Sequence, residues 1–495
     1  MKQLTALDNM FLALEQGNQY MHVASLGIYD PSSAPGGKVR FKQILAHYAS
    51  RLEQSKIYQR RLATVPLGLD LPFWVDEGDI DLEYHVRHMA LPHPGDWRQL
   101  MIQVARLHSR PLDHNRPLWE TYVIEGLDNI EGLPKGCFAI YAKIHHALVD
   151  GETGAELIRI QHDLMPVGRP VESLRTHIAD AEPSTLELVT RGISNRAARL
   201  IQTGRVLLNV GATGLRLSGK LVTQAAADPS TVSRVARNLL ETGNPGTRFS
   251  AAVSPHRIVD GISLSLAEFQ HIRSRLPGIS HNDIFLAVAA GAIRKYLGDK
   301  NELPGGTLHA AVPVSIRGEK KTTDAGNMVS GTFTALHTNI ADPVERLQAI
   351  HASMEKSKHV LDVIGQDLLT QLSQLIPQAP VHWVQKYLVA PRASVTVSNV
   401  RGPNVPLYFA GARLVRFMPI SIATDGVGLN LTGFSYDNQF WVCVVSCRKM
   451  MPDPSEFATC LQESFRDLLT AVSAPAIEDA TRAPAKARRR KKLAA

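Results

Sequence analysis

The sequence predicts a mixed α/β protein with two domains. The chain has 495 residues, too many for one ordinary hydrophobic core, and 44% hydrophobic with 20% charged residues is typical of globular proteins. Strand-like and helix-like patterns alternate from Met1 to about Asp163. The alternation resumes at about Ser254, so two mixed halves are expected.

In the first half, apolar residues at every second position predict strands, and a period near 3.6 residues predicts helices. The strand-like runs include residues 22–30 ("HVASLGIYD"), 119–127 ("WETYVIEGL") and 136–146 ("GCFAIYAKIHH"). Helix-like runs cover residues 39–54 and 152–164. The first half therefore mixes strands with helices along its whole length.

The second half begins with a strand-to-helix pattern at residues 256–276. A longer helical pattern, "HNDIFLAVAAGAIRKYL", follows at 281–297, and "LHAAVPVSIR" predicts a strand at 308–317. Two runs of period two at 426–448 are joined by Asp437-Asn438, which predicts a β-hairpin with a tight turn.

These patterns divide the chain into four regions. We expect an N-terminal domain at residues 1–166, a helical crossover at 167–253, a C-terminal domain at 254–480 and a basic, disordered tail at 481–495. No strand-like run occurs in the crossover.

Residues 188–227 of the crossover contain no acidic residue. On a helical projection most basic residues fall on one side, and the other side carries Val189, Ile193, Leu200, Leu207, Leu215 and Val222. Such a helix suits a membrane interface or lipid surface. It can equally pack its apolar side against the protein, and the two interpretations remain open.

The positive charge of the protein is concentrated at its end. The formal net charge is +8, and the segment from Arg482 to Ala495 carries seven Lys and Arg residues with no acid, so the rest is close to neutral. This distribution argues against a dedicated nucleic-acid surface and is compatible with attraction to anionic lipid. A solvated terminus without a role is the alternative interpretation.

Cellular location follows from cysteine usage and from apolar runs. The cysteines Cys137, Cys443, Cys447 and Cys460 have no zinc or redox spacing, which fits a reduced, cytoplasmic compartment. No signal peptide is visible, and no run of about 18 apolar residues occurs. We expect a cytoplasmic protein that does not span the membrane.

The stretch "AKIHHALVDG" places two adjacent histidines at the end of an apolar run. Read as a strand, residues 138–146 send His145 to one face and place on the other face Phe138, Ile140, Ala142, Ile144 and His146. At the end of an apolar row, an imidazole tends to stay neutral and can accept a proton. His146 is therefore predicted to be a general base, and Asp150 to hold the loop.

The histidine pair has three interpretations. A metal site made of His145, His146 and Asp150 is disfavoured because opposite strand faces separate the ligands. Two purely structural histidines remain an alternative. A histidine acid/base site without a protein nucleophile is favoured because no Gly-x-Ser-x-Gly motif accompanies the pair.

The motif "HHALVDG" resembles the His-His-x-x-x-Asp-Gly signature of the CoA-dependent acyltransferase superfamily. Three further motifs, "RPLW" at 116–119, "ND" at 282–283 and "SNVRGPNVPLYFAGARL" at 398–414, resemble the bacterial wax ester synthase/diacylglycerol acyltransferase family. One departure is Arg401, where the family commonly has proline. The resemblance implies two chloramphenicol-acetyltransferase-like domains, each a mixed sheet flanked by helices, with an active-site tunnel at their interface.

The resemblance also implies which residues form the site. The expected catalytic residues are His146, Asp150, His145, Gly151 and Asn282. Expected to bind substrate or line the channel are Pro117, Leu118, Trp119, Asp283, Ser398, Asn399 and Gly402. Each motif also has a structural interpretation: "PLW" as packing, and Ser280 with Asp283 as a capping box that starts a helix. At that helix start, Asn282 offers an amide donor suited to an oxyanion.

The resemblance implies an O-acyltransferase. A long-chain acyl group would move from acyl-CoA directly to a fatty alcohol or to diacylglycerol, with no cofactor and no metal. The enzyme would bind peripherally to the inner membrane or to lipid inclusions, where such acceptors reside. Two alternatives are a condensation-type enzyme that takes its acyl group from a carrier protein, and a non-catalytic lipid-surface protein of the same fold.

Overall fold

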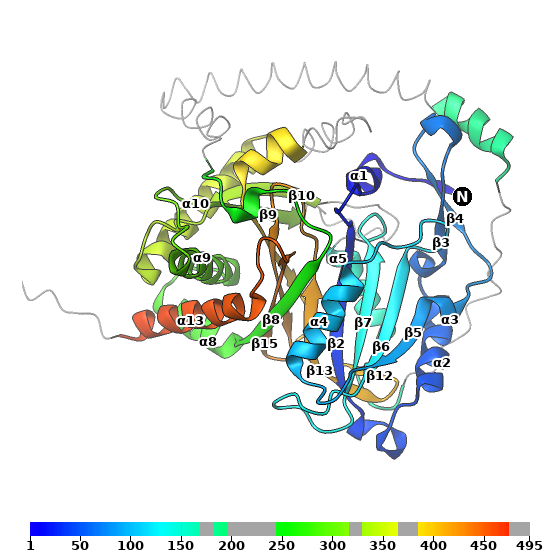
Figure 1. Ribbon diagram of the computed structural model, residues 1–495, viewed down its shortest axis with the longest axis horizontal. Coiled ribbons are helices and arrows are strands. Elements are labelled where there is room, and N and C mark those ends of the chain that lie inside the picture. The colour runs from blue at the N-terminus through cyan, green and yellow to red at the C-terminus, as the bar shows by residue number, and fades with distance from the viewer. Residues whose placement is uncertain (150, 169–182, 196–243, 316–328, 365–384, 475–495) are drawn as a thin grey trace, which may run out of the picture.

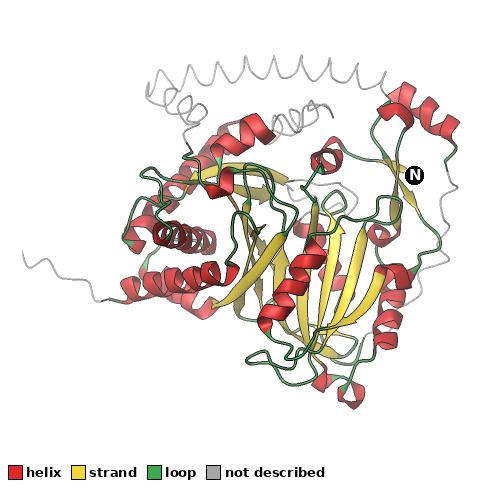
Figure 2. Cartoon of the chain, in the orientation of Figure 1, coloured by secondary structure: helices red, strands yellow, loops and turns green. Residues whose placement is uncertain are grey.

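A computed structural model describes residues 1–149, 151–168, 183–195, 244–315, 329–364 and 385–474. Two large sheets stand side by side, with most helices on their outer faces (Figures 1 and 2). This arrangement confirms the expected mixed α/β class, with mixed sheets flanked by helices.

The first large sheet has six strands in the order β12-β13-β2-β7-β6-β5. Neighbouring strands are antiparallel except for the parallel pair β5 and β6. The strands span, in chain order, β2 His22–Asp30, β5 Val86–Ala90, β6 Trp119–Glu125, β7 Phe138–His145, β12 Tyr408–Phe409 and β13 Ala412–Ile420. A small separate sheet contains β1 Lys2–Gln3, β3 Arg60–Ala63 and β4 Phe73–Asp76.

The second large sheet has the order β10-β9-β11-β14-β15-β8, and β11 runs parallel to both of its neighbours. Its strands span β8 Arg257–Ser265, β9 His309–Ser315, β10 Val329–Ala335, β11 Val395–Arg401, β14 Leu429–Tyr436 and β15 Gln439–Cys447. The predicted hairpin is confirmed, because β14 and β15 pair antiparallel across Asp437 and Asn438. Both turn residues have positive φ, as a tight hairpin turn requires.

The helices of the described chain cover the outer faces of the sheets and the junction between them (Figure 1). They span α1 Ala6–Leu14, α2 Phe41–Leu52, α3 Leu82–His85, α4 Trp97–His108, α5 Gly151–Gln161, α8 Leu266–Arg275, α9 His281–Asp299, α10 Pro343–Ile364 and α13 Pro454–Ser473. α9 packs between α10 and α13 beside the second sheet, and α4 packs on β8. The indole N–H of Trp97 on α4 donates to Asp260 on β8 at 2.9 Å, which ties the two sheets together.

Two strands from the second half of the chain belong to the first sheet. β13 pairs antiparallel with β2 and also packs against β14 and β15. One apolar core cluster therefore runs through both sheets, from Leu26 and Ile140 to Leu431 and Val442. The predicted domains at residues 1–166 and 254–480 group β12 and β13 with the second half of the chain, whereas the structure pairs them in the first sheet. Period-two patterning identifies a strand but not its partner.

The crossover and the tail lie mostly outside the described residues. Within the crossover, residues 185–195 form a helix. Leu188 packs against Val65 and Phe73, whereas Ile193, expected on the same apolar side as Val189, is 59% exposed. This helix therefore packs on the protein through another side than the projection indicated. The rest of the amphipathic stretch and the basic tail from Arg482 are not described.

Candidate active site

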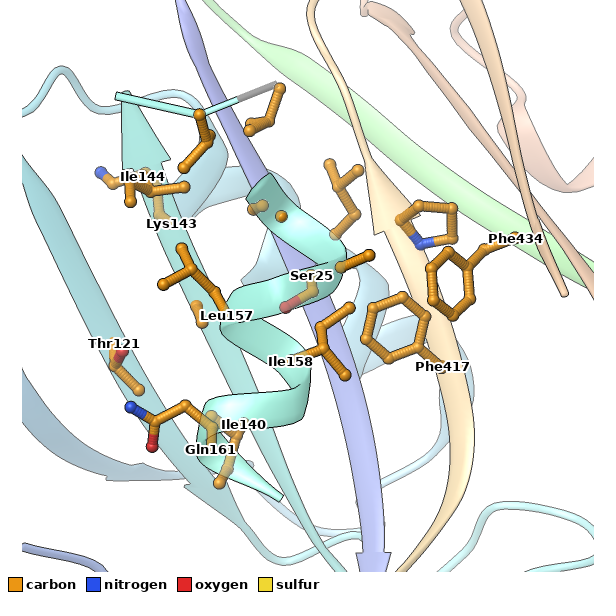
Figure 3. A pocket seen from close by; sticks show the side chains of 18 of the residues that line it. Ser25, Thr121, Ile140, Lys143, Ile144, Leu157, Ile158, Gln161, Phe417 and Phe434 are labelled. Carbon is orange, nitrogen blue, oxygen red and sulfur yellow. The ribbon is translucent and has the colours of Figure 1, made fainter. Parts of the chain in front are cut away.

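A cavity lies between the two sheets, with α5 along one side (Figure 3). Phe417 and Phe434 face Leu157 and Ile158 of α5 from the side of β13. Residues of both halves of the chain line this cavity: Ala24, Trp119, Ile140, Ala142, Ile144, His146, Leu157 and Ile158 from the first half, and Ser398, Val400, Phe417, Ile420, Thr432 and Phe434 from the second. Its wall is mainly apolar, which suits a hydrocarbon chain.

His146 faces this cavity, as the strand alternation predicted. Ile140, Ala142 and Ile144 of β7 line the cavity in succession, and His146 continues the row in the turn after the strand. The His146 N–H donates to the Met21 carbonyl at 2.8 Å, and its ring stacks on Phe11 of α1 with centroids 4.1 Å apart. The backbone bond and the ring contact together orient the imidazole.

His145 has a different environment. Its side chain is fully buried, with Nε2 at 2.8 Å from a carboxylate oxygen of Glu15. The Ala147 N–H donates to His145 Nδ1 at 3.0 Å, so Nδ1 supplies a lone pair and Nε2 carries the proton that is donated to Glu15. Burial lowers the pKa of His145 despite the nearby carboxylate. His145 is thus a neutral link between α1 and the turn that carries His146.

Glu15 joins His145 to a second histidine, His114, whose Nε2 lies 3.0 Å from the same carboxylate oxygen. Burial opposes ionisation of Glu15, but the hydrogen bonds from His114 and His145 outweigh it and lower the pKa of the carboxyl to about 2. The Glu15 hydrogen bond raises the pKa of His114.

Glu15, His114 and His145 present ligand atoms within 4.8 Å of one another, a spacing that a metal ion could use. Metal coordination would need the Nε2 lone pair of His145. The Ala147 N–H instead requires the lone pair at Nδ1, which leaves the proton on Nε2. The geometry therefore favours a hydrogen-bonded cluster in which a carboxylate accepts from two imidazoles.

The remaining residues of the histidine motif are only partly placed. Gly151 is the first residue of α5, so this helix starts at the last residue of the motif. Asp150, expected to hold the loop, lies outside the described residues.

The "PLW" motif lies against the histidine turn. Trp119 is the first residue of β6; it lines the cavity, stacks on His85 at 4.3 Å and donates its indole N–H to the Tyr58 carbonyl at 2.9 Å. The Leu118 carbonyl accepts from the His145 N–H at 2.9 Å. The Leu118 side chain is fully buried in a separate apolar cluster with Ala147, away from the cavity wall. Neither Leu118 nor Pro117 lines the cavity.

The motif at residues 398–414 begins on strand β11, where successive side chains point to opposite faces. Ser398 and Val400 line the cavity, whereas Asn399 points the other way and is exposed. Gly402 does not line the cavity, but a Cβ at this position would come within 2.3 Å of the ring of Phe434, which does. Ser398 is thus the member of this predicted group that faces the cavity directly.

The expected helix start at Asn282 and Asp283 is present. Ser280 caps α9, and the Asp283 carboxylate accepts from the Ser280 N–H and from His351 Nδ1 at 3.0 Å. Neither Asn282 nor Asp283 lines the cavity. The geometry of Asp283 supports the capping interpretation. The position of Asn282 outside the cavity lining argues against its predicted oxyanion role, which mutation can test.

Sequence reasoning missed Glu15, Phe11 and the aromatic wall formed by Phe417 and Phe434. Glu15 and His145 are 130 residues apart, and no local pattern marks Glu15 as the partner of a distant histidine. Such partners emerge only when the fold brings the segments together.

Comparison with known proteins places this site in a family. Residues 4–285 match the wax ester synthase/diacylglycerol acyltransferase catalytic domain, and residues 325–469 match the WS/DGAT C-terminal domain. A putative diacylglycerol O-acyltransferase of Mycobacterium tuberculosis is 35% identical over 95% of this chain and 100% of its own length. The O-acyltransferase WSD of Acinetobacter baylyi is 32% identical over 94% of this chain and 96% of its own length.

Solved structures agree with these matches. A wax ester synthase/diacylglycerol acyltransferase from Marinobacter aquaeolei VT8 aligns with a TM-score of 0.67 at 27% identity, over 96% of this chain and 100% of the other. The first condensation domain of the CDA synthetase aligns with a TM-score of 0.55 at 15% identity, over 96% of this chain and 97% of the other. The second likeness shows a shared fold alone.

Proposed function

Because the chain belongs to the wax ester synthase/diacylglycerol acyltransferase family, we propose that it moves a long-chain acyl group from acyl-CoA to a hydroxyl group. The acceptor is a fatty alcohol, which gives a wax ester, or diacylglycerol, which gives triacylglycerol. The observation that carries this proposal is the position of His146 at the end of an apolar row inside a cavity lined by both halves of the chain. Such a wall accommodates hydrocarbon, and the imidazole is the proton acceptor that an attacking hydroxyl needs.

In the proposed mechanism, His146 takes the proton of the acceptor hydroxyl while the oxygen attacks the thioester carbonyl. The resulting tetrahedral oxyanion collapses, the carbon–sulfur bond breaks, and CoA leaves as a thiolate. The histidinium then returns the proton to that thiolate, which is a weak base and needs little help to leave. Transfer is direct, so neither an acyl-enzyme nor a cofactor is required.

The supporting contacts of the two histidines give them different roles in this proposal. His146 acts on the substrate, whereas Glu15 and His145 hold the turn that carries it, and Trp119 with Ser398 shapes the channel wall. Gly151 is the first residue of α5. For Asp150, which lies outside the described residues, we propose that it holds the loop between His146 and this helix.

The direct test is incubation with palmitoyl-CoA and either hexadecanol or a diacylglycerol, with release of CoA and the lipid products measured. A parallel reaction with a palmitoylated carrier protein tests the condensation-type alternative. We expect product from acyl-CoA. Product from the carrier donor alone, or no product with either acceptor, would refute the proposal.

We further propose that the enzyme works in the cytoplasm, docked on the inner membrane or on lipid inclusions. No described helix combines the length and apolarity needed to cross a bilayer. The helix at 185–195 packs beside Val65 and leaves large apolar side chains exposed on this side of the molecule, namely Leu67 (95%), Leu186 (73%) and Ile193 (59%). Flotation with anionic vesicles tests this docking: an Ile193→Glu variant should float less than the wild type, whereas equal flotation would contradict it.

A further inference from the structure

The far end of the cavity carries polar side chains. The row from Ile140 on β7 to His146 directly after it spans six residue-to-residue steps, which corresponds to about 20 Å of extended strand. Figure 3 shows Gln161 at the Ile140 end, with its amide group near Thr121. Tyr29, Tyr48, Tyr58 and His162 complete the polar lining of this region.

This polar end is shielded from solvent. Gln161 is 6% exposed and Tyr58 is 8% exposed. Asp163, two residues after Gln161, forms a buried ion pair with Arg51 of α2 at 2.8 Å. A hydrocarbon chain that extends from His146 along β7 therefore ends among buried polar groups and not in bulk water.

Most of these polar groups are already paired. His162 Nδ1 donates to the Ile158 carbonyl at 2.6 Å, so Nε2 accepts from the Tyr29 hydroxyl at 2.9 Å. The Tyr48 hydroxyl interacts with Thr121. Gln161 differs: Tyr58 interacts with it, but neither its amide oxygen nor its amide nitrogen completes a hydrogen bond of normal geometry with a described residue.

A buried amide without full hydrogen bonding is costly, and a chain ending in a methyl group cannot satisfy it. Building on the proposed acyl transfer, we propose that this cavity accepts a long chain that carries a hydroxyl near its distal end. The Gln161 amide nitrogen donates to the chain oxygen, and the Gln161 carbonyl accepts from the chain hydroxyl. The Tyr58 hydroxyl interacts with the same Gln161 side chain. The hydroxylated chain is either the acyl group or the acceptor alcohol.

Two pairs of substrates test this inference and identify which chain enters. One arm compares ω-hydroxypalmitoyl-CoA with palmitoyl-CoA as donors for the same acceptor. The other compares hexadecane-α,ω-diol with hexadecanol as acceptors for palmitoyl-CoA, after correction for the two equivalent hydroxyls of the diol. In the arm whose varied chain enters the cavity, the wild type should have a higher kcat/KM for the hydroxylated chain than for the plain chain. Gln161→Leu should lower the ratio of these two kcat/KM values roughly tenfold, as expected for the loss of one neutral hydrogen bond.

Matched variants separate this effect from a general disturbance of the cavity. Ile158→Leu, which alters the apolar lining on the same helix, should change kcat/KM for both chains alike and leave their ratio unchanged. Tyr58→Phe, which removes the neighbouring hydroxyl, should lower the ratio as Gln161→Leu does, and it serves if Gln161→Leu fails to fold. If the ratio is the same in wild type, Gln161→Leu and Tyr58→Phe in both arms, the amide is satisfied by water and the inference is wrong. Absence of any product from palmitoyl-CoA and hexadecanol would instead refute the proposed function.

Discussion

Two adjacent histidines have separate environments because successive side chains of a strand point to opposite faces. His146 lines the cavity, whereas His145 is buried against Glu15. We expect His146→Ala to lower kcat/KM by about 10²- to 10⁴-fold, the usual contribution of a positioned general base, without changing the unfolding midpoint. His145→Ala should cost less turnover but more stability, because it leaves the Ala147 N–H without its acceptor. Steady-state kinetics with thermal unfolding checks both, and equal losses in two well-folded variants would contradict the assignment.

Glu15 is predicted to act on catalysis through His145, as a positioning residue. Glu15→Gln removes the negative charge that His145 Nε2–H donates to, and charged hydrogen bonds are about twice as strong as neutral ones. We expect kcat to fall about tenfold with little change in KM. The control is His114→Gln, which changes the exposed partner of the same carboxylate and should have a much smaller effect. Full activity of Glu15→Gln would show that the cluster does not position the catalytic turn.

At the scale of elements, two variants at the start of α9 distinguish a helix-capping role from a catalytic role. Ser280→Ala removes the side-chain cap and should lower the free energy of unfolding by about 1 kcal/mol while activity is retained. Asn282→Ala should retain most activity as well, because Asn282 does not line the cavity. Denaturant unfolding and turnover of both variants test this. A folded Asn282→Ala enzyme with abolished kcat would restore the oxyanion role that the helix start suggested.

At the scale of the whole molecule, buried neutral histidines should make stability depend on pH. Burial lowers the pKa of His108 to about 3 and that of His162 to about 4, and it also lowers the pKa of His22. Their folded-state pKa values lie below the unfolded value near 6.5, so the unfolded chain binds more protons in acid. Their contribution to stability is complete above about pH 6.5 and decreases below it, by about 1.4 kcal/mol per pH unit for each histidine until its folded pKa is reached.

Urea unfolding between pH 8 and pH 5 measures this dependence. His162→Asn should reduce the slope, whereas the exposed His359→Gln should not. Glu15 and His114 also affect how stability depends on pH. Glu15 loses its contribution only as the pH falls from about 4.5 toward 2. His114, with its raised pKa, contributes below about 6.5 and loses that contribution as the pH rises, but it is 44% exposed and therefore screened. A flat stability profile would contradict the neutral state of the buried histidines.

Local patterns in the sequence determined the class of most elements and the direction of particular side chains. Period-two alternation separated His146 from His145, Asp437-Asn438 marked the hairpin, and Ser280 marked the start of α9. Each depends on covalent geometry within a few residues, so it is readable without the fold.

Only the tertiary structure decided which distant segments meet. It placed β13 beside β2, brought Glu15 to His145, left Asn399 on the outer face of β11 and set Gln161 at the far end of the cavity. Strand partners and buried hydrogen bonds are selected by how whole surfaces pack and exclude water, and this depends on residues far apart in the chain. A period of two or 3.6 residues identifies the face that a side chain occupies, but it carries no information about the segment that covers that face.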